Sequence, residues 1–285
     1  MSVVTIKNVM TVDVEDYFHV AALAKSISVK DWEKIPSRVE SNTKRLLDLY
    51  DKYDIKVTFF VLGWVAERFP NLVKEIFQRG HEIASHGYSH QLIYSQSQSV
   101  FREETIRSKK ILEDITGDAV LGYRAASYSI TKKSLWALDI LYEEGFKYDS
   151  SIFPVRHDNY GIPGFPTEPH LAKTPSGRQI IEYPLATYKM LGQTLPVAGG
   201  GYFRIYPYWL SKYFYKRINC NNKSFVFYLH PWEIDPEQPR VKASCLSTFR
   251  HYRNLDKTEA RLTDLVSNFP FTTMKQALVD SGFLL

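Results

Sequence analysis

The sequence predicts an α/β fold in which parallel strands alternate with helices. Apolar runs typical of buried strands occur at residues 9–14, 57–62 and 82–86, and a segment with helical spacing follows each one. Strands that alternate with helices in this way indicate parallel βαβ units. The chain has 285 residues, 44% of them hydrophobic, which is enough for one large core of the α/β barrel type.

The predicted elements can be followed in chain order. After the strand at 9–14, Ser41 or Asn42 can cap a helix that runs to about Tyr53. The further predicted strands are 57–62, 82–86, 120–124 and 225–230, and the further predicted helices are 72–78, 97–115, 133–144, 258–267 and 274–279. Residues 152–201 are rich in Pro, Gly and Tyr, and we expect long loops and short hairpins there, over one face of the barrel.

Composition excludes several classes of protein. The net charge is +5, but the basic residues are scattered, so we expect a solvated surface and no nucleic-acid partner. No apolar stretch reaches the ~18 residues of a membrane span. The N-terminus lacks the pattern of a signal peptide, so we expect a cytoplasmic protein. Cys220 and Cys245 form no C-x-x-C pair, and free thiols are the default, with a disulfide left open.

Polar side chains follow the ends of several predicted strands. Asp13 ends the first strand, Glu15 and Asp16 come directly after it, and His86 and His90 follow the strand at 82–86. Alternate residues of a strand share a face, so Asp13 and Glu15 are expected to point the same way. Active sites of α/β barrels lie at the carboxyl ends of the strands. Two imidazoles and a carboxylate are the ligand set of a hydrolytic metal site with open positions.

Five motifs give the chain a resemblance to the polysaccharide deacetylases of the NodB-homology type, carbohydrate esterase family four. The run Ser-His-Gly-Tyr-Ser-His at 85–90 matches their second motif closely. Residues 11–16, 122–128, 148–154 and 229–232 resemble the first, third, fourth and fifth motifs. Residues 13–18 and 249–255 resemble a subgroup associated with exosortase and exopolysaccharide gene clusters. The resemblance implies one domain over residues 1–285, with a subgroup-specific part at about 155–285, folded as a distorted (β/α) barrel of seven strands.

Two departures from the family pattern concern the site itself. The family's adjacent Asp-Asp pair is replaced by Asp-x-Glu-Asp, so the metal carboxylate can be Glu15 or Asp16. Strand alternation favours Glu15, because it shares a face with Asp13. The third motif has Ala126 where the family usually has proline, which loosens the backbone but removes no chemical group.

The resemblance also implies roles for the site residues. Asp13 would be the general base, held in place by Arg124, and His230 the general acid, tuned by Asp149. One divalent ion would bind to His86, His90 and the carboxylate of Glu15 or Asp16. Zinc is favoured by the ligand type, and iron, cobalt, nickel and manganese also fit two histidines and one carboxylate.

Further residues are candidates for substrate contacts. Tyr128, Trp232 and Tyr17 could stack on sugar rings. A backbone N–H near Tyr128 could stabilise an oxyanion. Arg204 follows three glycines at 199–201, which we interpret as a substrate-side loop, although a simple hairpin turn fits nearly as well.

The function expected from these features is metal-dependent removal of N-acetyl groups from amino sugars of a polysaccharide or its precursor. One alternative is hydrolysis of small amides or cyclic imides by a relative that resembles allantoinases. Another is a non-catalytic carbohydrate-binding barrel, which the intact set of acids and histidines argues against. The expected partner is an N-acetylated saccharide. The oligomeric state stays open, with a homo-oligomer among the choices.

Overall fold

A computed structural model describes residues 6–158 and 160–285 of the chain. The first five residues, which belong to the N-terminal segment expected to lack a signal peptide, lie outside the described residues. It confirms the predicted α/β class. The main sheet contains seven parallel strands in the order β10 (Val226–Leu229), β1 (Asn8–Val14), β2 (Thr58–Val61), β3 (Glu82–Ser85), β4 (Gly122–Tyr123), β5 (Tyr148–Asp149) and β7 (Gln179–Glu182). β6 (His170–Lys173) adds to β7 in the antiparallel sense, and β11 (Phe271–Thr272) pairs with the start of β1. Among the described residues no pairing joins β10 to β6, so this distorted barrel stays open.

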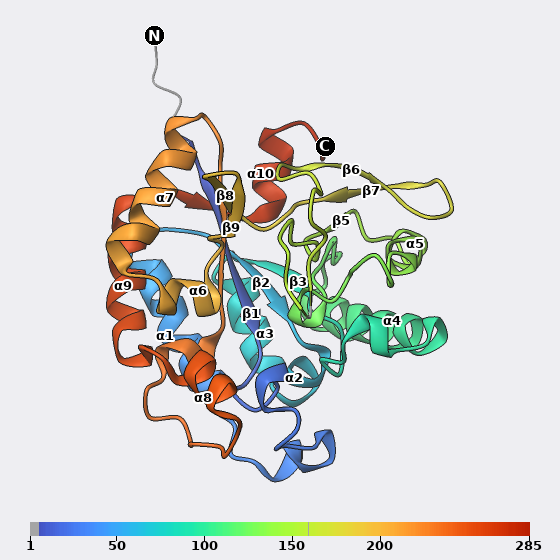
Figure 1. The fold of residues 1–285 in the computed structure, drawn as a ribbon. Helices are drawn as coiled ribbons and strands as arrows, with labels where there is room; N and C mark the ends of the chain where they lie inside the picture. Colours follow the sequence, from blue (N-terminus) through green and yellow to red (C-terminus); the bar gives the residue numbers. More distant parts are fainter. Residues whose placement is uncertain (1–5, 159) are drawn as a thin grey trace.

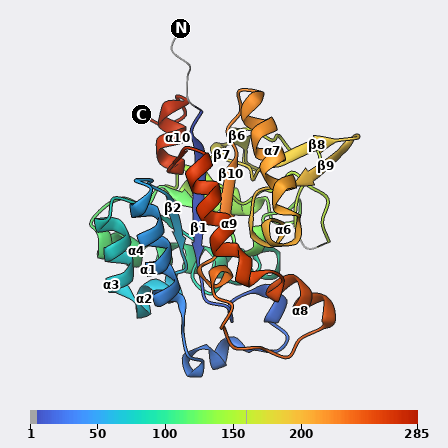
Figure 2. The same ribbon diagram turned by 90° about the vertical axis from the view of Figure 1, so that its left-hand side faces the viewer.

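Helices pack around this curled sheet (Figure 1). They are α1 (Val39–Lys52), α2 (Gly63–Arg68), α3 (Pro70–Gln78), α4 (Gln98–Thr116), α5 (Trp136–Glu143), α9 (Leu255–Asn268) and α10 (Met274–Asp280). Figure 2 shows α9 in front of β1 and β10. In the part of the chain that the structure describes, no helix combines the length and apolar character needed to cross a bilayer.

Residues 152–250 contain more regular structure than the sequence predicts. The expected hairpins are present as β6–β7 and as β8 (Thr187–Met190) with β9 (Gln193–Pro196). The glycine run opens a helix, α6 (Gly200–Ile205), where we expected a loop or hairpin turn. Two further helices were not predicted, α7 (Tyr208–Cys220) and α8 (Cys245–Tyr252). Aromatic residues lower the helix propensity of both segments, so tertiary contacts are what make these segments helical. Cys220 and Cys245 are free and exposed.

Helix α1 begins at Val39, earlier than the predicted caps at Ser41 and Asn42. The carboxylate of Asp16 accepts hydrogen bonds from the backbone N–H groups of Arg38 (2.7 Å) and Val39 (3.1 Å). These donors have no partner inside the helix, and a carboxylate there also interacts favourably with the helix dipole. The cap therefore comes from a residue more than twenty positions earlier in the chain, which local sequence patterns do not reveal.

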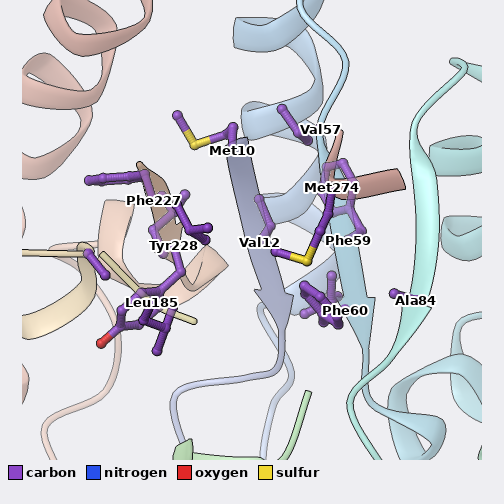
Figure 3. Close-up of a cluster of buried hydrophobic side chains, with 14 of the residues drawn as sticks. Met10, Val12, Val57, Phe59, Phe60, Ala84, Leu185, Phe227, Tyr228 and Met274 are labelled. Atoms are coloured by element: carbon purple, nitrogen blue, oxygen red, sulfur yellow. The ribbon is translucent and has the colours of Figure 1, made fainter. Parts of the chain in front are cut away.

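Alternation along β1 separates the core from the chemistry. Met10 and Val12 pack in the hydrophobic cluster of Figure 3, with Phe59 of the neighbouring strand and Met274 of α10. Thr11 and Asp13 point to the other face, where both accept hydrogen bonds from one guanidinium group. The same strand thus anchors the sheet and carries the first site residue.

Gly122 in β4 is a position where the packing permits no side chain. A Cβ atom there would lie 2.0 Å from Cζ of Tyr148, which is itself fully buried. We expect Gly122→Ala to lower the free energy of unfolding by about 3 kcal/mol or more, because overpacking forces the ring and its strand to move. Urea denaturation measures the change. Gly201→Ala is the matched control, because its Cβ would meet no atom closer than 4.0 Å and alanine favours the helix. Equal stability of the two variants would contradict the packing argument.

Candidate metal centre and catalytic site

Eight of the twelve predicted site residues line one open cavity at the carboxyl ends of the parallel strands, and Asp16, Tyr17, Arg124 and Asp149 do not. Its volume is about 200 Å³. Its lining comprises Asp13, Glu15, Val20, Ala21, Ala22, His86, His90, Ser127, Tyr128, Tyr160, Arg204, Tyr228, His230, Trp232, Arg250 and His251. Two larger cavities, of about 280 and 500 Å³, lie near the amino ends of β3 and β10, and none of the predicted site residues lines them. The chemistry therefore belongs to the smaller cavity.

Glu15, His86 and His90 form a cluster that fits a metal ion. One ligand atom from each lies within 4.8 Å of the others. A tight turn, in which the Glu15 N–H donates to the carbonyl of Asp13, keeps Glu15 on the cavity side after β1 ends. His86 directly follows β3, and Gly87, with φ of +74°, turns the chain so that His90 returns to the same point.

The hydrogen bonds of the cluster leave donor atoms available to a cation. Nδ1 of His86 contacts the carbonyl oxygen of Arg124 at 2.8 Å, which as the N–H donor leaves Nε2 with a free lone pair. Burial lowers the pKa of His86 to about 4, so the ring is neutral at pH 7. Oε2 of Glu15 is buried and accepts no well-aligned hydrogen bond, although Nε2 of His90 lies 2.7 Å away. This donor set suits a divalent ion such as zinc.

Asp16 lies outside this cluster, which corrects its candidacy as a metal ligand. Besides capping α1, its carboxylate accepts hydrogen bonds from the Ser37 hydroxyl (2.6 Å) and the Tyr17 N–H (2.9 Å). Both oxygens are therefore occupied by protein donors. The alternative favoured by strand alternation, Glu15, is the carboxylate that the fold presents to the two histidines.

We expect Glu15→Ala to weaken zinc binding by about 100-fold or more, since even the loss of an outer partner of a ligand costs about 10- to 100-fold. Asp16→Ala should keep the affinity and instead destabilise the fold by about 1–2 kcal/mol, the usual effect of a lost helix cap. Isothermal titration with zinc and urea denaturation separate the two effects. The assignment of Glu15 is wrong if zinc affinity falls only in the Asp16 variant.

Asp13 is held by the buried guanidinium group of Arg124. Nη1 of Arg124 donates to Oδ1 of Asp13 and to Oγ1 of Thr11, each at 2.7 Å. The rest of the guanidinium donates to the hydroxyl and carbonyl oxygens of Ser150. The other oxygen of Asp13, Oδ2, faces the cavity, where the Tyr128 hydroxyl lies 3.4 Å away. The expected pairing of Asp13 with Arg124 is present, and it leaves one carboxylate oxygen open to the cavity.

His230 has a different carboxylate partner from the one predicted. Its Nδ1 lies 2.7 Å from Oε1 of Glu233, and its Nε2 lies 3.4 Å from Oε1 of Glu15 and 3.9 Å from Oδ2 of Asp13. Asp149, the predicted partner, instead accepts hydrogen bonds from Ser151. The register of β5 and β7 places Asp149 beside Glu182, away from His230. The carboxylate that contacts His230 is therefore that of Glu233, where Asp149 was predicted.

Arg204 supports Glu233 and does not reach out as a free substrate contact. Its Nε donates to Oε2 of Glu233 at 2.5 Å, and its Nη1 donates to the carbonyl oxygens of His251 and Arg253. The local sequence contained a signal for Glu233, because Pro231 and Glu233 stand at the first and third positions of a short helical turn after His230. A glutamate at that third position commonly reaches back to the capping residue.

The charges of Arg204, Glu233 and His230 stabilise one another. Burial alone would raise the pKa of Glu233, but the charge of Arg204 and the hydrogen bond with His230 lower it to about 2. Burial alone would lower the pKa of His230, but the carboxylates of Glu15 and Glu233 raise it to about 9. Before a cation binds to Glu15, His230 is therefore protonated at neutral pH.

The aromatic residues predicted to stack on sugars have other roles. The face of Trp232 is covered by the parallel rings of His230 and His251, at centroid distances of 5.1 and 4.3 Å, and its Nε1 donates to Glu15 at 3.3 Å. Tyr17 is buried against Phe18, outside the lining of the cavity. Neither ring is placed to stack on a sugar as predicted, because histidine rings cover Trp232 and Tyr17 is buried outside the cavity lining.

Tyr128 does line the cavity, in a strained turn. Ser127 and Tyr128 have φ of +51° and +54°, a region that costs residues other than glycine about 1 kcal/mol or more. The Tyr128 N–H donates to the carbonyl of Ala125, so this group itself is occupied, and an oxyanion donor from another backbone N–H near Tyr128 stays a prediction. The strain turns the Tyr128 ring toward Asp13 and Tyr228.

The fold and site define an open α/β barrel with a Glu–His–His cluster at the carboxyl ends of its strands. Residues 30–142 match the family model "Polysaccharide deacetylase", and residues 150–279 match "Domain of unknown function (DUF3473)". The chain is 33% identical over 113 residues to a peptidoglycan deacetylase of Helicobacter pylori and 36% identical over 98 residues to a peptidoglycan-N-acetylglucosamine deacetylase of Bacillus cereus. The first alignment covers 40% of this chain and 38% of the relative, and the second covers 34% and 36%.

A solved structure from Mycobacterium smegmatis, described as that of a polysaccharide deacetylase, has the same fold. The TM-score is 0.63 at 18% sequence identity, over 100% of this chain and 94% of the other. Residues 30–142 are thus similar to polysaccharide deacetylases in sequence, and the whole chain shares their fold. The exosortase-associated subgroup stays a prediction.

Proposed function

We propose that this protein is a metal-dependent N-deacetylase that removes acetyl groups from amino sugars of a polysaccharide or its precursor. The observation that carries the proposal is the placement of Asp13 and His230 beside the Glu15–His86–His90 cluster, in a single cavity. The similarity to peptidoglycan deacetylases adds support for an acetylated saccharide as the substrate.

Hydrolysis of an acetamido group needs a base, an acid and stabilisation of the developing oxyanion. A divalent ion held by Glu15, His86 and His90 would supply a Lewis acid that polarises the acyl oxygen and lowers the pKa of water. Asp13 accepts the proton of the attacking water through Oδ2, the oxygen that Arg124 leaves open. His230 then donates a proton from Nε2 to the sugar nitrogen as the C–N bond breaks. The products are acetate and a free amine.

The surrounding residues keep these groups in position. Arg124 fixes the orientation of Asp13 through one oxygen, because both side chains are buried and the contact is a short ion pair. Glu233 holds Nδ1 of His230, so that Nε2 faces the cavity. Trp232 donates to Oε1 of Glu15, and Nε2 of His90 lies against the other oxygen, Oε2. The side chains of Asp13, His230 and Glu15 are thus held in place before a substrate binds.

Acetate release from N-acetylchitooligosaccharides, together with metal analysis of the purified protein, tests the proposal. We expect about one divalent ion per chain and stoichiometric formation of acetate and amine. Chelation should abolish turnover, and added zinc should restore it. Ring opening of a cyclic imide without acetate release from any saccharide would favour the small-amide alternative instead. A protein that binds metal and saccharide without hydrolysing either substrate class would be the non-catalytic barrel.

A further inference from the structure

The wall of the cavity that faces the metal cluster contains two arginine side chains. Arg204 comes from α6 and Arg250 from the last turn of α8. Both belong to residues 150–279, the part that matches the domain of unknown function. Figures 1 and 2 place α8 beyond the carboxyl end of β1, and its residue Arg250 lines the cavity. This part of the chain therefore supplies positive charge to the substrate-facing wall.

The two arginines differ in their partners. Arg204 is buried and forms an ion pair with Glu233, so its charge is compensated. On the other wall, Asp13 is compensated by Arg124 in the same way. Arg250 is exposed, and no acidic side chain within the described residues lies within ion-pair distance of it. Among the described residues that line the cavity, Arg250 is thus an arginine without an acidic partner.

The position of Arg250 is fixed by its neighbours. Helix α8 packs against the short turn at Ala21–Leu23, whose small exposed residues Ala21 and Ala22 form the adjoining part of the rim. On the other side lies Tyr160, stacked on His157 at a centroid distance of 3.8 Å. Burial lowers the pKa of His157, and the nearby charge of Arg250 lowers it further. The guanidinium group of Arg250 therefore lies at the mouth of the cavity, near the small residues Ala21 and Ala22 and near the aromatic ring of Tyr160.

We propose that Arg250 binds an anionic group, a carboxylate or a phosphate, on the saccharide whose acetamido group enters the cavity; this inference rests on the deacetylase function proposed above. A guanidinium group presents paired N–H donors that match the oxygens of either anion. Its exposed position lets the guanidinium group exchange water for a ligand without losing an internal ion pair. The substrate class is accordingly an acidic N-acetylated saccharide and not a neutral one.

The test compares three probes on the zinc-loaded protein: N-acetylchitotetraose, a hyaluronan tetrasaccharide and UDP-N-acetylglucosamine. KM and kcat are measured by acetate release, and Kd by calorimetry for any probe that is not turned over. We expect at least one acidic probe to bind about 10-fold more tightly than the neutral probe, the size of effect expected for a hydrogen bond between charged groups. Preference for the uronate identifies a carboxylate, and preference for the nucleotide sugar identifies a phosphate.

Arg250→Ala should remove this preference by raising the KM or Kd of the acidic probe about 10-fold with no such change for the neutral probe, and Arg250→Glu should reverse the preference. Arg240→Ala is the matched control, because Arg240 is also exposed and lies over the Tyr252 ring outside the cavity lining. Equal affinity of the wild-type protein for all three probes overturns the inference. An equal loss in both alanine variants does so as well, because it would reflect net charge alone. Absence of acetate from every probe, with the Arg250-dependent preference intact, would refute the proposed reaction and leave the anion site standing.

Discussion

Replacing Asp13 with asparagine is expected to reduce acetate release by about 10²- to 10⁴-fold, the usual contribution of a general base. The amide has nearly the same shape as the carboxylate and can still accept the hydrogen bond from Arg124. It cannot take a proton from water, because its oxygen is far less basic. Zinc should remain bound, since Asp13 lies beside the ligand cluster and is not one of its three members. Initial rates and metal content measured on the same preparation check both parts.

The control for this variant must separate chemistry from stability. Arg124 is completely buried, so loss of its counter-ion can cost about 3–5 kcal/mol. Asp16→Asn, which alters another buried aspartate, should also lose stability but keep its rate constant per folded molecule. Thermal unfolding of both variants gives the folded fraction for the comparison. Full activity in Asp13→Asn would exclude Asp13 as the base, and loss of zinc would move it into the ligand set.

Glu233→Gln is expected to lower kcat by about 10²- to 10³-fold with little change in KM, because most of the general-acid contribution depends on a correctly oriented His230. The carboxylate of Glu233 fixes Nδ1 as the donor and directs Nε2 toward Asp13 and Glu15. Glutamine can donate as well as accept, so it no longer selects one orientation or one charge state of the ring. Steady-state kinetics over a range of saccharide concentrations separate kcat from KM.

Asp149→Asn provides the comparison, because the family resemblance gave this residue the role that the structure gives to Glu233. Asp149 contacts Ser151 and lies beside Glu182, so its replacement should affect folding more than kcat. Glu233→Asp should recover part of the activity by restoring the charge at a longer distance. The opposite ranking, with kcat lost in Asp149→Asn and kept in Glu233→Gln, would return the tuning role to Asp149.

Motifs and alternation in the sequence were sufficient to predict the Glu15–His86–His90 cluster and its neighbours Asp13 and His230. The apolar runs predicted five of the seven parallel strands, because the burial of both sheet faces requires continuous hydrophobic segments, whereas β5 and β7 were not predicted. His86 and His90 were predicted as ligands from their motif, and period-two alternation favoured Glu15 over Asp16. Each of these predictions depends on residues a few positions apart, where the local backbone geometry is known in advance.

Tertiary structure decided which partner each of these groups has. Asp16 caps a helix that begins more than twenty residues later, and Trp232 lies between two histidines, one of them nineteen residues further along the chain. Glu233 was within reach of sequence reasoning as a capping residue, but its pairing with Arg204 joins two elements through the folded core. The exposed position of Arg250 likewise depends on how α8 packs. Side-chain pairing across elements follows from packing and charge compensation in three dimensions, which no spacing along the chain encodes.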